Sequence, residues 1–289
     1  MSRRESALEE ALKIREATKE TVPAGGIAEA AVKQPDLPRF DIGEILVDFA
    51  RVNKHVVCIT EPHSPAAEQY KRIRARILKS TVKDFLNTIM ITSPDMGEGK
   101  TITALNLAVT MANEIDYTVL LVDADLRNPS VHRYLGIEPE YGLGDYLMGR
   151  VKLPDVLIKT GIGKLVILPG GKPPDNPAEL LSSERMRLLV QEMKLRYKDR
   201  YIIFDSSPVL VTADPLSLGG YMDGIVLLIQ AAYTSSKAAA QAISLLKDFT
   251  LLGTVFNNVP HYLERNFYSY YYQDGKQGTV KKYPYGKRA

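Results

Sequence analysis

The chain has 289 residues, of which 45% are hydrophobic and 25% are charged, and its formal net charge is +3. This composition is typical of a soluble globular protein, and the charge is too small to indicate nucleic-acid binding. The single cysteine, Cys58, excludes an internal disulfide framework and fits a reducing compartment. No apolar run approaches the roughly 20 residues that span a bilayer, and charged residues follow Met1 where a signal peptide would have an apolar core. We therefore expect a cytoplasmic protein, for which a role at a membrane requires a partner.

Residues 1–50 are predicted to form an arm that consists of an N-terminal helix and a linker. Leu8, Ala11 and Leu12 share one face of a helix over 5–19, and the prolines and glycines of 21–38 are typical of a linker. The helix is either a solvated arm or a segment that docks on a partner or on another copy of the chain. We favour the solvated arm because isolated helices of this length are marginally stable in water.

Between residues 51 and 261, apolar runs alternate with helical patterns. Strand-like runs are found at 56–60, 88–92, 119–122, 165–168, 201–204, 225–229 and 253–256. Helical patterns are found at 65–79, 101–113, 183–196 and 235–249. The helix at 65–79 has Ser64 as its cap and Pro65 at its first position. Continuous apolar strands separated by helices predict one α/β domain over 51–261, with a mostly parallel central sheet and helices on both faces.

The pattern of strands and helices stops at Tyr262. The last 28 residues contain 7 of the 16 tyrosines, with glycine and basic residues between them. Because this segment has no apolar period from which to build a core, we expect 262–289 to be a flexible tyrosine-rich tail.

A glycine-rich turn lies between the strand at 88–92 and the helix at 101–113. Such a turn exposes backbone N–H groups at a helix N-terminus, which suits phosphate oxygens. Lys100 would reach the β and γ phosphates of ATP, and the Thr101 hydroxyl would bind Mg²⁺. The predicted nucleotide-binding residues are Met96, Gly97, Glu98, Gly99, Lys100, Thr101 and Ile102. Pro94 stands where the usual pattern begins with glycine, but the strand and helix on either side argue against an ordinary glycine turn.

Three aspartates follow two other strand-like runs. Asp205 ends the run at 201–204, where an acidic residue that holds the magnesium shell is expected. Asp123 and Asp125 end the run at 119–122, and residues two apart in an extended segment point the same way. We favour Asp123 as the catalytic base and Asp125, with Thr101 and Asp205, around the metal. Lone acids of this kind are often helix caps or solvated turn residues, but here a phosphate loop accompanies them.

Arg127 completes the predicted catalytic set of Lys100, Asp123, Asp125 and Arg127. Its position two residues after Asp125 allows its guanidinium either to contact a phosphate or to bridge to a neighbouring side chain.

Together these segments resemble the bacterial protein-tyrosine kinases of exopolysaccharide and capsule loci. The family's phosphate loop resembles 97–101, its D-x-D-x-R motif matches 120–127, and its D-x-x-P motif matches 202–208. Further similar stretches lie at 64–68, 168–171 and 176–181, so that the resemblance covers roughly 60–260 and the tyrosine cluster. The resemblance implies a P-loop NTPase-like fold and an ATP- and Mg²⁺-dependent tyrosine autokinase that regulates polysaccharide chain length, polymerisation or export. The chain is similar to the stand-alone form of the family. In that form the membrane-spanning chain-length regulator is a separate polypeptide that recruits the kinase to the inner face of the plasma membrane.

The resemblance also implies that the tail tyrosines accept phosphate, mainly from a neighbouring subunit. The implied acceptors are Tyr268, Tyr270, Tyr271, Tyr272, Tyr283 and Tyr285. The family assembles into rings through an E-x-x-R-x-x-R helix, to which Glu68, Lys71 and Arg74 correspond. Lys71 replaces the first arginine, and a lysine is a point charge that cannot form a bidentate pair. We expect phosphorylation of the tail to weaken the contacts between subunits, because the added phosphates repel one another.

Two other functions are compatible with the phosphate loop. ATPase switches of the chromosome-partitioning and division-site type share the fold, but they carry an extra lysine at the start of the loop, where this chain has Asp95. They also provide no reason for a tyrosine-rich tail. A non-catalytic adaptor that binds a nucleotide and a membrane partner is a third possibility, against which the intact Lys100, Thr101 and three aspartates argue.

Overall fold

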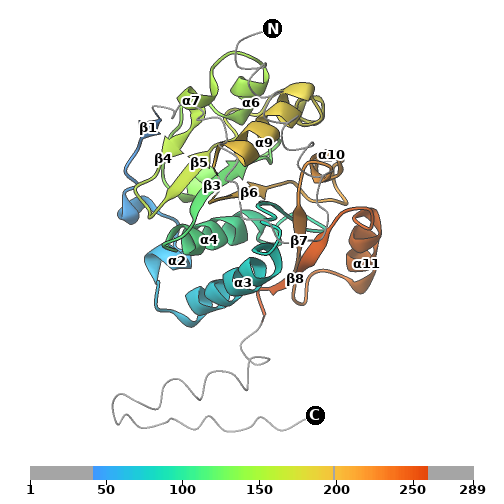
Figure 1. The fold of residues 1–289 in the computed structure, drawn as a ribbon. Helices are drawn as coiled ribbons and strands as arrows, with labels where there is room; N and C mark the ends of the chain where they lie inside the picture. The colour runs from blue at the N-terminus through green and yellow to red at the C-terminus, as the bar shows by residue number, and fades with distance from the viewer. Residues whose placement is uncertain (1–41, 198, 260–289) are drawn as a thin grey trace, which may run out of the picture.

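The computed structural model describes residues 42–197 and 199–259, in which eight strands form one sheet (Figure 1). The strands are β1 (Gly43–Glu44), β2 (Thr88–Thr92), β3 (Thr118–Asp123), β4 (Ile158–Lys159), β5 (Leu165–Leu168), β6 (Arg200–Asp205), β7 (Gly224–Gln230) and β8 (Leu251–Asn257). Their order across the sheet is β1-β4-β5-β3-β6-β2-β7-β8. All neighbouring pairs are parallel except β4 and β5. The predicted mostly parallel sheet is therefore confirmed.

Helices cover both faces of this sheet (Figure 1). They are η1 (Phe49–Arg51), α2 (Val57–Thr60), α3 (Pro65–Thr81), α4 (Lys100–Ala112), α5 (Val131–Tyr134), α6 (Leu143–Leu147), α7 (Leu153–Val156), α8 (Pro177–Leu181), α9 (Glu184–Arg196), α10 (Asp214–Gly219) and α11 (Ser236–Leu245). The four long helices that the sequence predicts are all present. As expected, α3 begins with Pro65, and the Ser64 hydroxyl accepts a hydrogen bond from the Ala67 N–H.

The central strands are buried on both faces, which explains their continuous apolar runs. In β2, Ile89 and Ile91 pack with α2, α3 and α4 on one face, and Met90 between them packs with α9 on the other. All residues of β2 and β6 are buried. Full burial of each large apolar side chain contributes roughly 1.5–3 kcal/mol, so the two cores flanking the sheet fix its position between the helix layers.

The predicted strand at 56–60 is wrong, because Val57–Thr60 forms helix α2 and lies against α4 instead of joining the sheet. The Asn106 side chain in α4 forms two hydrogen bonds at the start of this turn. Its Oδ1 accepts a hydrogen bond from the Cys58 N–H (2.9 Å), and its Nδ2 donates to the His55 carbonyl (2.9 Å). A short apolar run fits a buried helix as well as a buried strand, and the partner that decides between them lies about 50 residues away.

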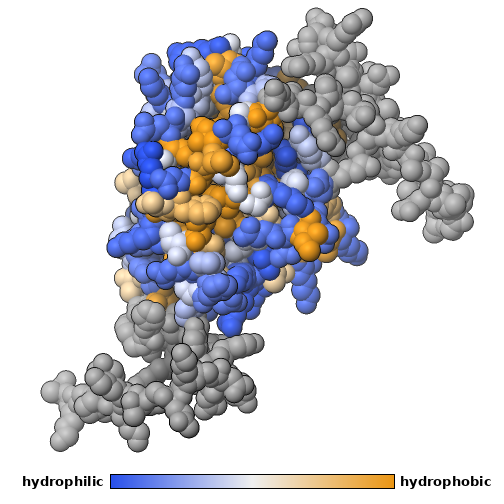
Figure 2. Space-filling view, turned by 90° about the vertical axis from the view of Figure 1, so that its left-hand side faces the viewer, coloured by the Kyte–Doolittle hydropathy of each residue, from blue (hydrophilic) through white to orange (hydrophobic). Residues whose placement is uncertain are grey.

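The sheet begins before residue 51, where we expected the domain to start. Strand β1 pairs with β4 through Gly43 and Glu44. Figure 2 shows hydrophobic residues among hydrophilic ones on the side of the molecule where β1 and β4 lie. After β1 the exposed apolar side chains are Ile45, Leu46 and Phe49. The predicted helix at 5–19 and the tyrosines of 262–289 lie outside the described residues.

The topology brings the three predicted motifs to one edge of the sheet. Strand β6 lies between β3 and β2, and Asp205 at its end is in register with Asp123 on one side and Ile91 on the other. Since all three strands are parallel, their carboxyl ends and the loops that follow them converge, as expected for a ligand site in an α/β sheet.

Candidate active site

The segment between β2 and α4 has the backbone conformation of a phosphate-binding loop. Gly97 and Gly99 have φ angles of 74° and 94°, in the left-handed region that favours glycine. Helix α4 begins directly afterwards at Lys100, so its first N–H groups are free to meet an anion. A Cβ atom at Gly99 would also lie 2.4 Å from Asn257 Nδ2, so a side chain there has neither the conformation nor the space it needs.

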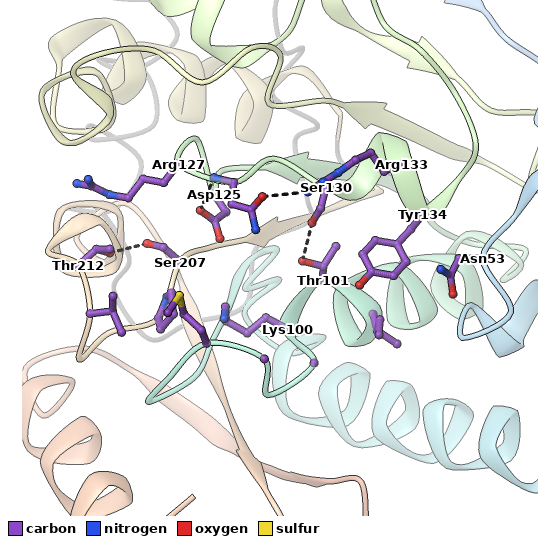
Figure 3. Close-up of a pocket in the computed structure, with 17 residues that line it drawn as sticks. Asn53, Lys100, Thr101, Asp125, Arg127, Ser130, Arg133, Tyr134, Ser207 and Thr212 are labelled. Carbon is purple, nitrogen blue, oxygen red and sulfur yellow. Dashed lines mark hydrogen bonds between the residues drawn. The ribbon is translucent and has the colours of Figure 1, made fainter. Parts of the chain in front are cut away.

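A cavity of about 520 Å³ opens beside this loop (Figure 3). Of the predicted site residues, those that line it are Met96, Gly97, Gly99, Lys100, Thr101, Ile102, Asp125 and Arg127. Asp123, Asp205 and the Glu98 side chain are fully buried and do not line it. The structure thus brings most of the predicted set together around one space, with three acidic side chains behind its wall.

Nine further lining residues had no predicted role. They are Asn53, Asn128, Ser130, Arg133, Tyr134, Ser207, Pro208, Val211 and Thr212. Eight of them belong to the segments that follow β3 and β6, and ligands in α/β sheets bind at the carboxyl ends of strands. That rule was sufficient to identify these two segments from the sequence. Asn53 precedes α2, and no pattern in the sequence indicates it.

Lys100 is almost fully buried, with 8% of its surface exposed, and its side chain points into the cavity (Figure 3). Burial lowers the pKa of its ammonium group, and the carboxylates of Asp205 and Asp125 oppose that change. A cation held in this way, beside a loop of free N–H groups, is suited to binding the terminal phosphates of a nucleotide.

Asp123 and Asp205 form a buried pair of carboxylates on adjacent strands. Asp123 Oδ2 accepts hydrogen bonds from the N–H groups of Ser130 (2.8 Å) and Val131 (3.0 Å). Its Oδ1 and both carboxylate oxygens of Asp205 are buried without a hydrogen-bond partner. Burial, reinforced by Asp125, raises the pKa of Asp123 to about 7. Burial and the neighbouring Asp123 also raise the pKa of Asp205 well above its ordinary value.

These unpaired oxygens are what a hard cation would satisfy. Among the described residues, no three His, Cys, Asp or Glu side chains form a metal-binding group by themselves. Mg²⁺ commonly takes only one or two carboxylates and completes its shell with a hydroxyl, phosphate oxygens and water. The Thr101 hydroxyl lies beside Asp205 and accepts a hydrogen bond from the Ser130 hydroxyl (3.2 Å). The residues present therefore fit a magnesium ion that binds together with a nucleotide.

Asp125 differs from Asp123 because its carboxylate reaches the cavity (Figure 3). Its Oδ1 accepts a hydrogen bond from the Asn128 N–H (3.2 Å). Burial raises the pKa of Asp125, and the Lys100 ammonium opposes the rise. The two aspartates of the D-x-D motif therefore do not both face the cavity, because β3 ends at Asp123 and the chain turns after it.

Arg127 forms the bridge that was one of its two expected roles. Its Nε and Nη2 donate to the two carboxylate oxygens of Asp214, at 2.8 and 3.0 Å. Asp214 is fully buried at the start of α10 and also accepts a hydrogen bond from the Ser207 hydroxyl (3.4 Å). Arg127 therefore ties the loop after β3 to the segment after β6 on the rim of the cavity.

The three residues of the predicted oligomerisation helix lie apart from the cavity on α3. Lys71 pairs with Glu68 on the same helix, with Nζ 2.5 Å from Oε1. Arg74 reaches the C-terminal end of α4, where its Nη1 lies 3.0 Å from the Thr110 carbonyl and 2.7 Å from Glu114 Oε1. Both basic side chains have partners within one subunit.

In the described part of the chain, no helix is long and apolar enough to cross a membrane. The predicted phosphate acceptors lie outside the described residues; they are Tyr268, Tyr270, Tyr271, Tyr272, Tyr283 and Tyr285.

The fold and the cavity together define a P-loop nucleotide-binding protein. A family model described as an AAA domain matches residues 86–254, which is more than half of the chain. The tyrosine-protein kinase YwqD of Bacillus subtilis is 39% identical over 210 residues, covering 72% of this chain and 87% of that protein. The structure of the kinase domain of the Escherichia coli tyrosine kinase ETK matches with a TM-score of 0.67 and 26% identity, over 80% of this chain and 85% of that one.

The chain therefore belongs to the bacterial tyrosine-protein kinases, within the AAA domain family. This confirms the resemblance seen in the motifs. The septum site-determining protein MinD of Pyrococcus horikoshii has a TM-score of 0.51 and 24% identity over 59% of this chain and 69% of that chain. At that identity the likeness concerns the fold alone.

Proposed function

We propose that this protein is an ATP-dependent tyrosine autokinase that phosphorylates tyrosines of its own residues 262–289. The observation that carries the proposal is the cavity in which Lys100 and Asp125 face each other beside the phosphate loop, backed by the unpaired oxygens of Asp123 and Asp205. A site that only had to bind a nucleotide would need the loop and the lysine. The accessible carboxylate adds a group that can take part in a transfer.

We assign the magnesium shell to the Thr101 hydroxyl and to the buried carboxylates of Asp123 and Asp205. This reverses the division of roles that we favoured from the sequence, because Asp123 lies behind the cavity wall and Asp125 lies in it. When bound, a magnesium ion would neutralise part of the negative charge on the nucleotide's phosphates.

Asp125 is then the candidate general base. Its carboxylate can accept the proton of an incoming tyrosine hydroxyl, because it is the aspartate of the motif that such a group can approach. A bond forms between the phenolic oxygen and the γ-phosphorus, the bond between that phosphorus and the β–γ bridging oxygen breaks, and ADP leaves. Lys100 offsets the charge on the transferred group.

We further propose that the acceptors are tail tyrosines of a neighbouring subunit and that the activity regulates polysaccharide chain length, polymerisation or export. The relatives' names support a tyrosine kinase, and the tail supplies seven tyrosines without an apolar pattern. A separate membrane-spanning regulator would recruit the protein to the inner face of the membrane. Assembly through Glu68, Lys71 and Arg74 belongs to the same proposal.

The test is incubation of the purified protein with ATP and Mg²⁺, followed by mapping of phosphate by mass spectrometry. Lys100→Met and a truncation after Pro260 serve as controls. Phosphotyrosine within 262–285 that is absent in Lys100→Met supports autokinase chemistry on the tail. ATP hydrolysis without phosphotyrosine, even with the membrane partner added, would instead favour an ATPase switch, for which the MinD-like fold is the supporting observation.

A further inference from the structure

Glu98 belongs to the phosphate loop, but contact with a nucleotide does not explain the position of its side chain. Its neighbours Gly97, Gly99 and Lys100 line the cavity, but the Glu98 side chain does not, and no part of the residue is exposed. A buried carboxylate is costly unless hydrogen-bond donors satisfy it. Its partners therefore indicate what the loop is fastened to.

Two donors, one within the loop and one outside it, satisfy the carboxylate of Glu98. Its Oε2 accepts a hydrogen bond from the Asp95 N–H (3.0 Å), which closes the loop on itself. Its Oε1 accepts a hydrogen bond from the Thr234 hydroxyl, which belongs to the connection between β7 and α11. The same hydroxyl accepts a hydrogen bond from the Gln230 N–H (2.9 Å), so Thr234 links the end of β7 to the phosphate loop.

The backbone of Glu98 has a third attachment. Asn257, the last residue of β8, donates from its Nδ2 to the Glu98 carbonyl (2.8 Å), and its own carbonyl accepts the Ala231 N–H (2.9 Å). The absent side chain of Gly99 makes this approach possible, because a Cβ atom there would meet Asn257 Nδ2 at 2.4 Å. The loop is thus bound to the ends of two strands, and β8 leads directly into the residues that carry the tail.

We infer that Thr234 and Asn257 are positioning residues, which act through Glu98 to hold the phosphate loop in the conformation that binds nucleotide. Neither residue lines the cavity, and so neither touches the phosphates. The inference rests on the proposed function only in requiring that the site binds a nucleotide, not that it transfers phosphate.

The arrangement has a direct energetic consequence. If the Thr234 hydroxyl is removed, Glu98 Oε1 is left buried without a hydrogen-bond donor. The carboxylate can then be hydrated only if the loop moves away from its position. A hydrogen bond to a charged group contributes enough to change an equilibrium by roughly tenfold or more. Because the loop must return to its binding conformation before nucleotide binds, the lost hydrogen bond lowers the affinity for nucleotide. The rate of a reaction that starts from the bound complex changes much less.

The experiment measures binding of ADP with Mg²⁺ by calorimetry in the full chain and in four variants. Thr234→Val keeps the shape of the side chain but loses the hydroxyl, Thr234→Ser keeps the hydroxyl, and Asn257→Ala removes the amide donor. Thr254→Val, at an exposed position of β8, is the matched control. We expect Thr234→Val and Asn257→Ala to bind ADP about tenfold more weakly, with Thr234→Ser and Thr254→Val within about twofold of the parent.

A second readout separates positioning from general stability. In the parent, we expect ADP to slow hydrogen exchange of the β8 amides at residues 251–257, and we expect this nucleotide-dependent protection to be lost in Asn257→Ala. Equal ADP affinity of Thr234→Val and the parent would overturn the inference, as would a Thr234→Ser variant as weak as Thr234→Val. If Thr234→Val does not fold, Asn257→Ala decides instead, and equal ADP affinity of Asn257→Ala and the parent then overturns the inference. Because ADP binding is measured without any phosphotyrosine, a failure of the autokinase proposal gives a different result from a failure of this one.

Discussion

Arg127 and Asp214 form a bidentate ion pair on the rim of the cavity, with Arg127 Nε 2.8 Å from Asp214 Oδ2 and Nη2 3.0 Å from Oδ1. The carboxylate is fully buried, whereas the arginine side chain is 44% exposed. The pair joins the loop after β3 to helix α10, and through them two of the three motifs. This geometry gives Arg127 a structural role in addition to any contact with a phosphate.

We therefore expect Arg127→Ala to lower the free energy of unfolding. Breaking a buried ion pair costs about 3–5 kcal/mol, and the exposure of Arg127 to screening by water reduces the expected loss to about 1–2 kcal/mol. Urea denaturation at pH 7 measures it. The matched control is Arg187→Ala, whose partner Glu184 is 65% exposed and whose removal should change stability by less than about 0.5 kcal/mol. Equal losses in the two variants would contradict a structural role for Arg127.

The two aspartates of the D-x-D motif are expected to fail in different ways. Asp125→Asn removes the accessible carboxylate, so the rate of phosphotyrosine formation at saturating ATP and Mg²⁺ should fall by about 10²–10⁴-fold while nucleotide binding persists. Asp123→Asn alters a buried oxygen without a partner, so it should weaken binding of Mg²⁺ with ADP. Initial rates and magnesium titrations distinguish the two.

Asp116→Asn, at an exposed position before β3, is the control for this pair. If instead Asp123→Asn stops phosphate transfer without weakening binding of Mg²⁺, Asp123 is the base, as the sequence alone led us to favour.

The contrast between these residues shows why the motifs could be predicted from the sequence but their roles could not. A strand followed by a glycine turn and a helix has a local signature, and so do acids at strand ends, so the loop at 97–101 and Asp205 were found. Whether Asp123 or Asp125 reaches the cavity depends on where β3 ends and on the hydrogen bonds from Ser130 and Val131. No short window of sequence contains that information.

The same reason explains the error at Val57–Thr60 and the missed partners of Glu98. Asn106, about 50 residues away from Cys58, pairs with the backbone of that segment and favours a helical turn. Thr234 and Asn257 lie more than 130 residues from Glu98. Contacts over such separations are set by the order of strands in the sheet, which apolar periodicity does not encode.

Asp223 and Lys194 provide a pH-dependent contribution to stability at the opposite end of the strands. Asp223 precedes β7 and accepts hydrogen bonds from the Thr88 N–H and hydroxyl, and it pairs with Lys194 of α9. Burial raises the pKa of Asp223, but Lys194 and Thr88 lower it by more. The resulting pKa lies below the ordinary value of 3.8. The pair therefore stabilises the fold fully above that value, and the contribution is lost as the pH falls through the lower pKa of the folded state.

We expect Lys194→Met to lower the free energy of unfolding at pH 7 by about 1–2 kcal/mol, as for the loss of a hydrogen bond to a charged group. The difference from the parent should shrink as the pH falls below that ordinary value, because Asp223 becomes protonated in both proteins. Urea denaturation at several pH values between 2 and 7 measures this. A difference that is constant with pH would show that Lys194 acts by packing alone.

Two basic residues of helix α3, Lys71 and Arg74, have different contacts within the subunit, although the ring hypothesis gives both the same role. Arg74 is bonded to the Thr110 carbonyl and to Glu114 at the end of α4, so Arg74→Ala should lower the free energy of unfolding by about 1–2 kcal/mol, whatever its effect on assembly. Within the part of the chain that the structure describes, Lys71 forms an ion pair with Glu68 of the same helix, and both side chains are more than a third exposed. Lys71→Ala should therefore change stability by less than about 0.5 kcal/mol.

Lys71 is for this reason the residue that tests assembly without disturbing the subunit. If α3 is the contact between subunits, Lys71→Arg should strengthen self-association, because a guanidinium can pair bidentately with a carboxylate of the neighbour and an ammonium cannot. Lys71→Ala should weaken self-association. Sedimentation velocity over a range of protein concentrations measures both, with unfolding curves to show that the subunits are equally stable. If both variants sediment as the parent does at concentrations where the parent associates, α3 does not form the contact through this position, and the assembly must use another surface.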